Sequence, residues 1–317
     1  MFIYISLRIV YDKEKGGVHM IITDITRIGD PQILLYEGKY YCYATSHPKG
    51  FMVWVSDDLV NWGEPTVCFD AENHWGSDSY WAPEVVYHKG KFVMHYTARI
   101  KENNDTLYLG VAVADSPLGP FEDVWGKPMF DLGYATIDGS VLVCDEGNFF
   151  YYSRDCSQNI INGGKVSQIY CVELDDTLTR AIGEHQLMTT PENDWELKSL
   201  PSNHLWNEGP CVIRRGDKYL MNYSANFYGS NDYSICIAVA DSPRGPWIKQ
   251  PEANPVLCSR ESLFGAGHNA FFTAKDGRLM TSFHVQTDPE HPSGDRRVCI
   301  GEVRFREENG VIYQEII

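Results

Sequence analysis

The chain has 317 residues, of which 43 % are hydrophobic and 13 % aromatic, enough for one large all-β domain or two ordinary domains. Its formal net charge of −16 argues against a nucleic acid or an anionic membrane as partner, because polyanions repel an acidic surface. The nine cysteines are scattered singly, which disfavours zinc sites and a disulfide framework and favours reduced, buried thiols.

The N-terminal segment MFIYISLRIV is apolar but too short to span a membrane. Arg8 interrupts it and no small-residue cleavage site follows, which disfavours a signal peptide. The repeating pattern of the chain begins only after Met20, so we expect residues 1–20 to form an extension outside the core, with Met20 as an alternative start. We therefore expect a cytoplasmic protein.

A unit of β-strands then repeats along the chain. Each unit reads as a strand, a Gly-containing turn, a second strand, a polar loop and a further strand, which is a hairpin pattern. The five units run from Asp30 to Trp62, from Trp81 to Phe121, from Asp138 to Leu174, from Glu208 to Trp247 and from His268 to Phe305.

The length of the repeat indicates the architecture. Two similar stretches, Ala-Val-Ala-Asp-Ser-Pro-x-Gly-Pro, begin at Ala112 and Ala238 and lie 126 residues apart, which corresponds to two repeats of about 63 residues. Four-stranded units repeated radially are the blades of a propeller. Because five units account for the chain and no linker or helical periodicity interrupts them, we predict an all-β, five-bladed β-propeller that forms a single domain over residues 1–317.

Three carboxylates begin the first strands of three units: Asp30, Asp138 and Glu208. The first strand of each propeller blade lines the central shaft, so these carboxylates and His268 of the fifth unit are expected to face one funnel. Glycoside hydrolysis needs such a cluster, with one acid to protonate the leaving oxygen and one carboxylate to activate water. A third carboxylate can tune the pKa of the acid.

Two structural alternatives apply to these residues. Asp before Pro or Gly is a common turn residue, and a lone histidine is more often packed in a core than a ligand. Glu84, inside the first strand of the second unit, is a competing acid that could reach the rim of the shaft.

Aromatic residues are expected to form the walls of the funnel. Trp81, Trp206 and Phe51 are the candidates for stacking on a sugar ring. Trp62 and Trp247 fall on outer strands and are predicted to serve the packing of the blades. The loops 99–107, 154–166, 189–206 and 285–295 are expected to shape the pocket.

Several segments resemble glycoside hydrolase family 43, in the order in which that family carries them. They are Gly29-Asp30-Pro31-Gln32-Ile33, Tyr80-Trp81-Ala82-Pro83-Glu84, Ile137-Asp138-Gly139-Ser140, Asn207-Glu208-Gly209-Pro210, Gly265-Ala266-Gly267-His268-Asn269, Asp58-Leu59-Val60-Asn61-Trp62 and Ala114-Asp115-Ser116-Pro117-Leu118-Gly119-Pro120. The resemblance covers about residues 24 to 305.

The resemblance implies an inverting exo- or endo-hydrolase of arabinose-, xylose- or galactose-containing glycans. Of these we expect an exo-acting enzyme that cleaves α-L-arabinofuranosyl or β-D-xylosyl linkages of plant-type oligosaccharides. The resemblance implies that Asp30 is the general base, Glu208 the general acid and Asp138 the residue that sets the pKa and orientation of the acid. It also implies that Arg296, or its neighbour Arg297, contacts sugar hydroxyls. His268 would ligate a calcium ion or hold a water beneath the substrate, and no cofactor is otherwise expected.

Other functions stay open at this point. Many xylosidases append a β-sandwich, and because twelve residues follow Phe305 in this sequence we do not expect one here, which keeps β-galactan- and galactofuranoside-cleaving activities among the alternatives. A non-catalytic glycan-binding propeller is a further alternative. Five-bladed enzymes of the invertase and levansucrase kind carry Asn-Asp-Pro, Arg-Asp-Pro and Glu-Cys signatures, and this chain has Gly29-Asp30-Pro31 without the other two.

Overall fold

The computed structural model describes residues 8–12, 17–72, 74–102, 105–198 and 203–317. The described chain is built from β-strands, and its three helical segments are single 3-10 turns at Cys156–Gln158, Asp194–Glu196 and Pro251–Ala253. None of the helices in these residues is long and apolar enough to cross a membrane.

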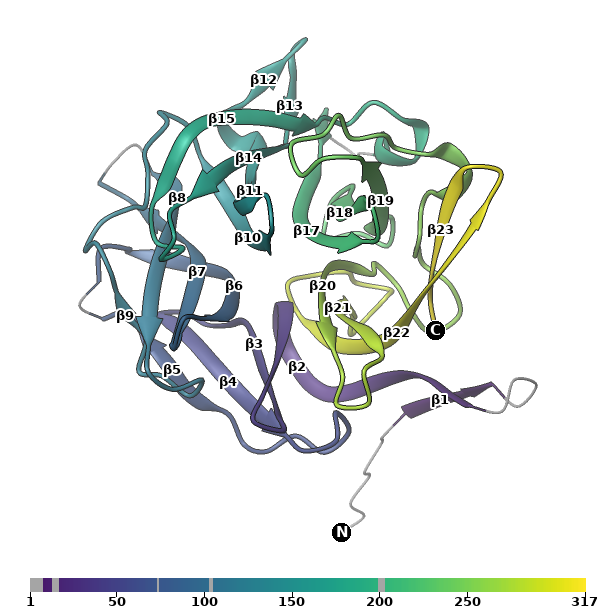
Figure 1. The fold of residues 1–317 in the computed structure, drawn as a ribbon, viewed down its shortest axis with the longest axis horizontal. Helices are drawn as coiled ribbons and strands as arrows, with labels where there is room; N and C mark the ends of the chain where they lie inside the picture. Colours follow the sequence, from purple (N-terminus) through teal and green to yellow (C-terminus); the bar gives the residue numbers. More distant parts are fainter. Residues whose placement is uncertain (1–7, 13–16, 73, 103–104, 199–202) are drawn as a thin grey trace.

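Five antiparallel blades stand around a central axis, which confirms the predicted propeller (Figure 1). The inner strands are β2 (Gly17–Tyr36), β6 (Asp78–His88), β10 (Thr136–Cys144), β17 (Asn207–Arg215) and β20 (Gly267–Thr273). The second strands are β3 (Lys39–His47), β7 (Lys91–Ile100), β11 (Gly147–Arg154), β18 (Lys218–Ala225) and β21 (Leu279–Gln286). The outer strands are β4 (Gly50–Ser56), β5 (Thr66–Asp70), β8 (Thr106–Ala114), β9 (Glu122–Asp123), β14 (Gln168–Leu174), β15 (Ala181–Thr189), β19 (Ser234–Ala240) and β22 (Arg296–Glu308).

Strand β2 closes the ring because it belongs to two blades. Its first half, from Met20 to Ile28, pairs with β22 as the outer strand of the fifth blade. Its second half, from Gly29 onward, pairs with β3 as the inner strand of the first blade. Strand β1 (Arg8–Asp12) pairs with the start of β2, and Met20, where the expected extension ends, is buried in the core.

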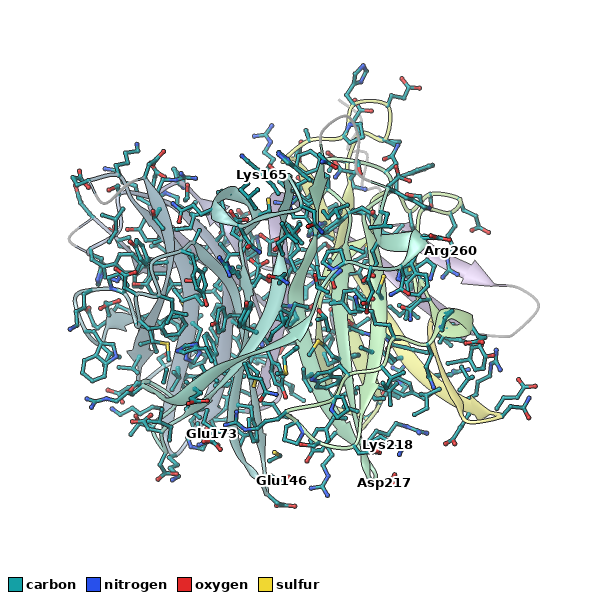
Figure 2. The ribbon with its side chains drawn as sticks, turned by 90° about the horizontal axis from the view of Figure 1, so that it is seen from above. Glu146, Lys165, Glu173, Asp217, Lys218 and Arg260 are labelled. Atoms are coloured by element: carbon teal, nitrogen blue, oxygen red, sulfur yellow. The ribbon has the colours of Figure 1, made fainter. Side chains whose placement is uncertain are left out.

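The remaining short strands lie outside the blades proper. Strand β23 (Val311–Ile316) pairs with the second half of β22. Strands β12 (Ile160–Ile161), β13 (Gly164–Val166) and β16 (His204–Leu205) form a small sheet of their own. Figure 2 shows Lys165 of this sheet at one face of the molecule, whereas Glu146 and Asp217, in the turns between inner and second strands, lie at the opposite face. The inner strands therefore begin near the face that carries the small sheet.

Every inner strand has a bulge near its beginning, where its pairing with the second strand skips a residue. One residue in each bulge has a left-handed backbone, with φ between 46° and 56°: Asp30, Ala82, Asp138, Gly209 and His268. A bulge redirects a side chain and ends regular pairing, and positive φ is uncommon for residues other than glycine. The equivalent of Asp30 and Asp138 in the fourth blade is therefore Gly209, so Glu208 lies one residue earlier than the hairpin pattern predicted.

The backbone N–H of each left-handed residue is held by a side chain from the preceding blade. The acceptors are Thr45 for Ala82 (2.8 Å), Thr97 for Asp138 (3.2 Å), Ser224 for His268 (2.7 Å), His284 for Asp30 (3.1 Å) and the Asp138 carboxylate for Gly209 (3.1 Å). These hydrogen bonds satisfy N–H groups that the bulges remove from the strand ladders. They also link the start of each inner strand to the neighbouring blade.

The core lies between adjacent blades, where large aromatic side chains pack. Phe51 is fully buried there, against Phe69, Tyr80 and Tyr96. The prediction that Phe51 stacks on a sugar is therefore wrong, because its strand, β4, is an outer strand and turns this side chain into the contact between the first two blades.

The predictions for the two outer-strand tryptophans and for the cysteines agree with the structure. Trp62 and Trp247 pack in the blade cores, as predicted. All nine cysteines are free, and most are buried, with Cys258 exposed.

Candidate active site

A cavity of about 720 Å³ opens where the inner strands begin. Asp30, Asp138, Glu208, His268 and Arg296 all line it, although they come from four different blades. The convergence of the three carboxylates and His268, predicted from their places in the repeats, is confirmed, and Arg296, which the resemblance implied, joins them.

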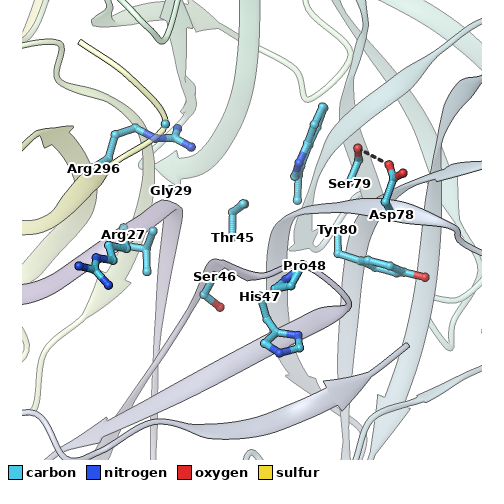
Figure 3. Close-up of a pocket in the computed structure, with 13 residues that line it drawn as sticks. Arg27, Gly29, Thr45, Ser46, His47, Pro48, Asp78, Ser79, Tyr80 and Arg296 are labelled. Carbon is cyan, nitrogen blue, oxygen red and sulfur yellow. Dashed lines mark hydrogen bonds between the residues drawn. The ribbon is translucent and has the colours of Figure 1, made fainter. Parts of the chain in front are cut away.

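A second hollow of about 390 Å³ adjoins this cavity on the side of the first two blades (Figure 3). Thr45, Trp81, Gly294 and Arg296 line both spaces, so Trp81 and Arg296 stand at their boundary.

Asp30 is surrounded by hydrogen-bond donors, among them the Arg296 guanidinium. Thr45 Oγ1 donates to its Oδ2 at 2.6 Å, and an Arg296 guanidinium nitrogen donates to its Oδ1 at 3.0 Å. Nδ1 of His268 lies 3.2 Å from the same oxygen. Burial acts to raise the pKa of Asp30, but Arg296 and His268, together with the hydrogen bond from Thr45, outweigh burial and hold that pKa well below its usual range.

The position of Arg296 depends on a glycine. A Cβ at Gly29 would lie 2.0 Å from the Arg296 guanidinium, so the guanidinium reaches Asp30 by passing against bare backbone. The guanidinium also lies 4.9 Å from the ring centre of Tyr228. Arg296 rather than Arg297 is thus the arginine of the cavity, as predicted.

Asp138 and Glu208 occupy the opposite kind of environment. Burial raises the pKa of Asp138 to about 6, and the nearby Asp30 charge adds to this, whereas His268 and the Gly209 N–H act against it. Burial also raises the pKa of Glu208 well above its ordinary value, and the neighbouring Asp138 carboxylate raises it further. The Tyr233 hydroxyl donates to Glu208 Oε1 at 2.9 Å.

The aromatic wall on the acid side is made by Trp206, Phe227 and Tyr228. The rings of Trp206 and Phe227 pack with their centres 5.3 Å apart. Trp81 lines the cavity on the side of the second blade, so two of the three predicted wall residues, Trp81 and Trp206, are in place.

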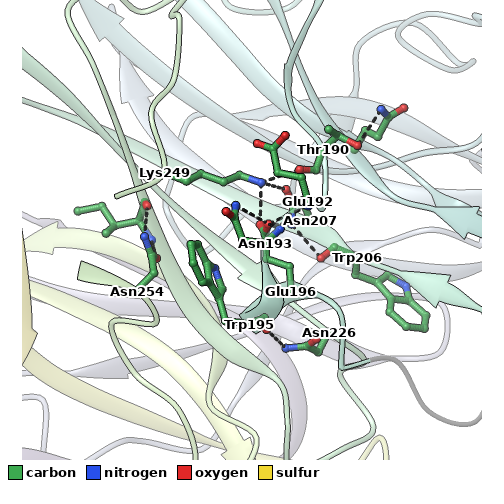
Figure 4. A network of polar contacts seen from close by, with 12 residues as sticks. Thr190, Glu192, Asn193, Trp195, Glu196, Trp206, Asn207, Asn226, Lys249 and Asn254 are labelled. Atoms are coloured by element: carbon green, nitrogen blue, oxygen red, sulfur yellow. Dashed lines mark hydrogen bonds and ion pairs between the residues drawn. The ribbon is translucent and has the colours of Figure 1, made fainter. Parts of the chain in front are cut away.

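A buried ion pair anchors the segment that carries Trp206 and Glu208 (Figure 4). The Lys249 ammonium donates to Glu196 at 2.7 Å and to the Asn207 side-chain oxygen at 2.9 Å. The Asn207 amide donates to the same Glu196 oxygen at 2.8 Å. Because Asn207 lies between Trp206 and Glu208, this network fixes the start of β17 to the 190–196 segment and to the loop after β19.

The predicted loops contribute to the cavity, but one contributing loop was missed. Arg99 and Asp105, Asp155 to Gln158, Trp206 and Gly294 come from the four predicted loops. The segment 227–233 supplies Phe227, Tyr228 and Tyr233, and sequence reasoning did not identify it.

Thr45 and His284 were also missed, although a signal for them exists. In four blades the residue that pairs beside the bulge lies 15 positions after the left-handed residue, namely Thr45, Thr97, Ser153 and Ser224, and His284 is 16 positions after His268. All of these side chains except Ser153 accept the backbone N–H of the left-handed residue in the next blade.

Glu84 lies below the cavity rather than in it. It lines the narrow shaft together with Gln32 and Ser140, and it accepts the Val141 N–H at 2.7 Å. Burial raises its pKa to about 7. Glu84 is therefore a partly buried structural acid of the shaft and not a competitor of Glu208.

The surroundings of His268 do not form a calcium site. Among the residues that the structure describes, no three His, Cys, Asp or Glu side chains are placed to share a metal ion. Calcium takes six to eight oxygen ligands, and one imidazole beside one carboxylate does not supply them. The side chains present do not fit the calcium ion that the resemblance implied, and we assign no step of the reaction to a metal.

The arrangement suits transfer of two protons in one cavity. An ionised carboxylate can accept a proton from water, and a carboxyl group that keeps its proton near neutral pH can donate it to a leaving oxygen. The surroundings of Asp30 favour the ionised form and those of Glu208 the protonated form, and no hydrogen bond joins the two groups among the described contacts.

Comparisons with known proteins agree with this chemistry. A thermostable family-43 glycoside hydrolase of known structure is 41 % identical, with a TM-score of 0.85 over 92 % of this chain and 94 % of that one. An endo-1,4-beta-xylanase from Bacteroides thetaiotaomicron is 30 % identical, with a TM-score of 0.78 over 92 % of this chain and 96 % of that one. A beta-D-galactofuranosidase from Aspergillus niger is 26 % identical, over 89 % of this chain and 81 % of the relative.

The family model of glycosyl hydrolases family 43 matches residues 25–311, which include all five blades and every cavity residue named above. The chain belongs to glycosyl hydrolases family 43 and is a glycoside hydrolase.

Proposed function

We propose that this glycoside hydrolase is an inverting, exo-acting enzyme that cleaves α-L-arabinofuranosyl or β-D-xylosyl linkages of plant-type oligosaccharides. The observation that carries the mechanism is the opposite electrostatic environment of two carboxyl groups on one cavity, Asp30 and Glu208. The choice of sugars is supported by relatives that are exo-α-(1→5)-L-arabinofuranosidases and a beta-xylosidase.

In the proposed reaction Asp30 is the general base. It accepts a proton from a water molecule as the water oxygen bonds to the anomeric carbon. The Arg296 guanidinium, together with the His268 imidazole beside it, keeps Asp30 ionised and ready to accept this proton. Thr45 fixes the second carboxylate oxygen, so the carboxylate is held in one orientation.

Glu208 is the general acid of the proposed reaction. It donates its proton to the glycosidic oxygen while the bond from that oxygen to the anomeric carbon breaks. Asp138 keeps the acid protonated through its nearby negative charge, and it holds the backbone after Glu208 by accepting the Gly209 N–H. Because water attacks from the side opposite the leaving group, the anomeric configuration inverts.

The test uses para-nitrophenyl α-L-arabinofuranoside and β-D-xyloside, with proton NMR of the first sugar anomer released. Inversion supports the proposal, and a retained anomer contradicts it. Linear arabino- and xylo-oligosaccharides then separate the two modes of attack. Exo action releases single sugars at every time point, whereas internal cleavage gives a ladder of oligosaccharides first.

A galactofuranosidase activity is the second candidate. It is favoured by the beta-D-galactofuranosidase relative, which aligns with 89 % of this chain. The same three carboxylates would act, because the reacting atoms are equivalent in the two furanosides. A higher kcat/KM on para-nitrophenyl β-D-galactofuranoside than on the arabinofuranoside and the xyloside would establish this candidate.

A further inference from the structure

The two carboxyl oxygens of Glu208 have different surroundings. Oε1 accepts a hydrogen bond from the Tyr233 hydroxyl at 2.9 Å. No other hydrogen bond to the Glu208 side chain is present among the described residues, and Glu208 lines the cavity. The two oxygens are therefore not interchangeable in the folded protein.

We infer that Tyr233 is the positioning residue of the general acid and assigns its proton to Oε2. A protonated carboxyl group has one oxygen that carries the proton and one that only accepts. Since the tyrosine hydroxyl donates to Oε1, Oε1 is the accepting oxygen, and Oε2 carries the proton that goes to the glycosidic oxygen. This inference rests on the proposed role of Glu208.

The tyrosine ring is held firmly enough for this role. Tyr233 is 1 % exposed, and its ring stacks on the His284 ring with an interplanar angle of 5° and a centre-to-centre distance of 5.6 Å. A Cβ at Gly267 would lie 2.0 Å from the tyrosine ring, so the missing side chain at Gly267 makes room for it. The ring is thus confined on two sides.

Tyr233 connects the acid, Glu208, to a residue that supports the base, Asp30. His284, on which Tyr233 stacks, accepts the backbone N–H of Asp30 at 3.1 Å. Tyr233 therefore contacts the acid with its hydroxyl and the support of the base with its ring. A displacement of Tyr233 would change the position of Glu208 relative to Asp30.

Tyr233 also has a defined electrostatic effect on Glu208. Its hydroxyl stabilises the ionised form of the acid and so lowers the pKa, against burial and Asp138, which raise it. The other charged groups that face Glu208 are Asp155 and Asp30, and both raise its pKa. Removing the hydroxyl alone therefore raises the pKa of the acid, whereas a loss of packing has no defined direction.

The test is Tyr233→Phe, which keeps the ring and its stack on His284 and deletes only the donor. We expect kcat on an unactivated oligosaccharide to fall about tenfold or more, because its poor leaving group needs a well-aligned proton. On a para-nitrophenyl glycoside, whose leaving group needs little protonation, the loss should stay below about threefold. The alkaline limb of the kcat/KM profile should move to higher pH.

Two further variants keep the test decisive. Gly267→Ala leaves the hydroxyl in the chain but pushes the ring away, and it should reproduce the loss on the oligosaccharide. Tyr43→Phe is the matched control, because Tyr43 donates a buried hydrogen bond to the Pro117 carbonyl at 2.6 Å and does not line the cavity. The control should change thermal stability only.

The outcomes separate this inference from the proposed function. If Glu208→Gln leaves turnover of the oligosaccharide unchanged, the proposed function itself fails. If Glu208→Gln abolishes that turnover while Tyr233→Phe lowers both substrates equally, or leaves the alkaline limb in place, Tyr233 has only a packing role and the inference is overturned. Selective loss on the oligosaccharide together with the upward shift of the limb supports it.

Discussion

The two ends of the catalytic cavity place the same functional group in opposite surroundings. Asp30 is contacted by the Arg296 guanidinium and the His268 imidazole of the fifth blade, and these contacts favour its ionised form. Glu208 is buried near Asp138, with no cation in contact with it among the described residues, and these surroundings favour its protonated form. Whether a carboxyl group acts as the acid or as the base is therefore determined by the side chains that the neighbouring blades place around it.

The propeller fold explains how two carboxyl groups on one cavity come to have different surroundings. Radial symmetry brings five equivalent bulges to one axis, and three of their left-handed residues, Asp30, Asp138 and His268, line the same cavity from different directions. The fifth blade contributes His268 and Arg296 to the cavity, and the third and fourth contribute Asp138 and Glu208. A carboxylate facing the fifth blade becomes a base, and one between the third and fourth becomes an acid.

The largest effect is expected from Asp30→Asn, which removes the base while keeping its shape. Turnover should fall about a hundred- to ten-thousand-fold on every substrate, since water activation is needed whatever the leaving group. This contrasts with Glu208→Gln, which should spare substrates with good leaving groups. Steady-state kinetics on an oligosaccharide and an aryl glycoside measure both. Loss by Asp30→Asn on the oligosaccharide alone would contradict the assignment.

The next effect is expected from Arg296→Met, which removes the nearest cation of the base. The pKa of Asp30 should rise, because Arg296 is the strongest of the groups that lower it. A base must be ionised to act, so the acidic limb of the kcat/KM profile should move to higher pH by about one to three units. An unchanged acidic limb with an altered KM would mean that Arg296 only binds sugar.

A smaller effect is expected from Asp138→Asn at the other end of the cavity. Asp138 raises the pKa of Glu208, so its neutralisation should lower that pKa and move the alkaline limb to lower pH by about one unit. The acidic limb should stay in place. This shift is opposite in sign to the one expected for Tyr233→Phe, and the two variants measured together show whether one group is being tuned. If the alkaline limb moves in the same direction in both variants, this limb does not report the ionisation of Glu208.

The smallest effect on catalysis is expected from Phe51→Ala. Phe51 is fully buried between the first two blades, so the variant should lose about 3 to 5 kcal/mol of unfolding free energy. At temperatures where the variant is still folded, its KM should equal that of the wild-type protein. Trp81→Ala, at the cavity wall, should raise KM with a smaller loss of stability. Denaturant unfolding and kinetics of the pair check this contrast, and the reverse pattern would restore Phe51 as a sugar-binding residue.

Much of this fold could be predicted from the sequence because its determinants are local. Alternating strands with Gly turns, repeated five times, indicate the propeller, and a carboxylate at the start of a repeat indicates the axis. The repeat pattern did not predict that Glu208 precedes the left-handed residue of its bulge by one position. This offset depends on which residue of Glu208-Gly209 takes the left-handed conformation, and glycine does so more readily.

The partners of the catalytic residues were harder to predict because their contacts cross between blades. Thr45 and His284 look like ordinary strand residues, and only their common spacing from the bulges marks them. Tyr233 lies in a loop whose course no local pattern determines, and its contact with Glu208 joins residues 25 positions apart. Phe51 was misassigned for the same reason, since an aromatic residue in a strand fits a core and a sugar platform equally well.

The most direct measurement of the central claim is infrared difference spectroscopy of the carboxyl groups at pH 6. The spectrum of the wild-type protein minus that of Glu208→Gln should contain the carbonyl band of a protonated carboxylic acid. The corresponding difference for Asp30→Asn should contain the bands of an ionised carboxylate. If Glu208 contributes carboxylate bands at this pH, or Asp30 a protonated one, the two surroundings do not divide the roles of acid and base as we describe.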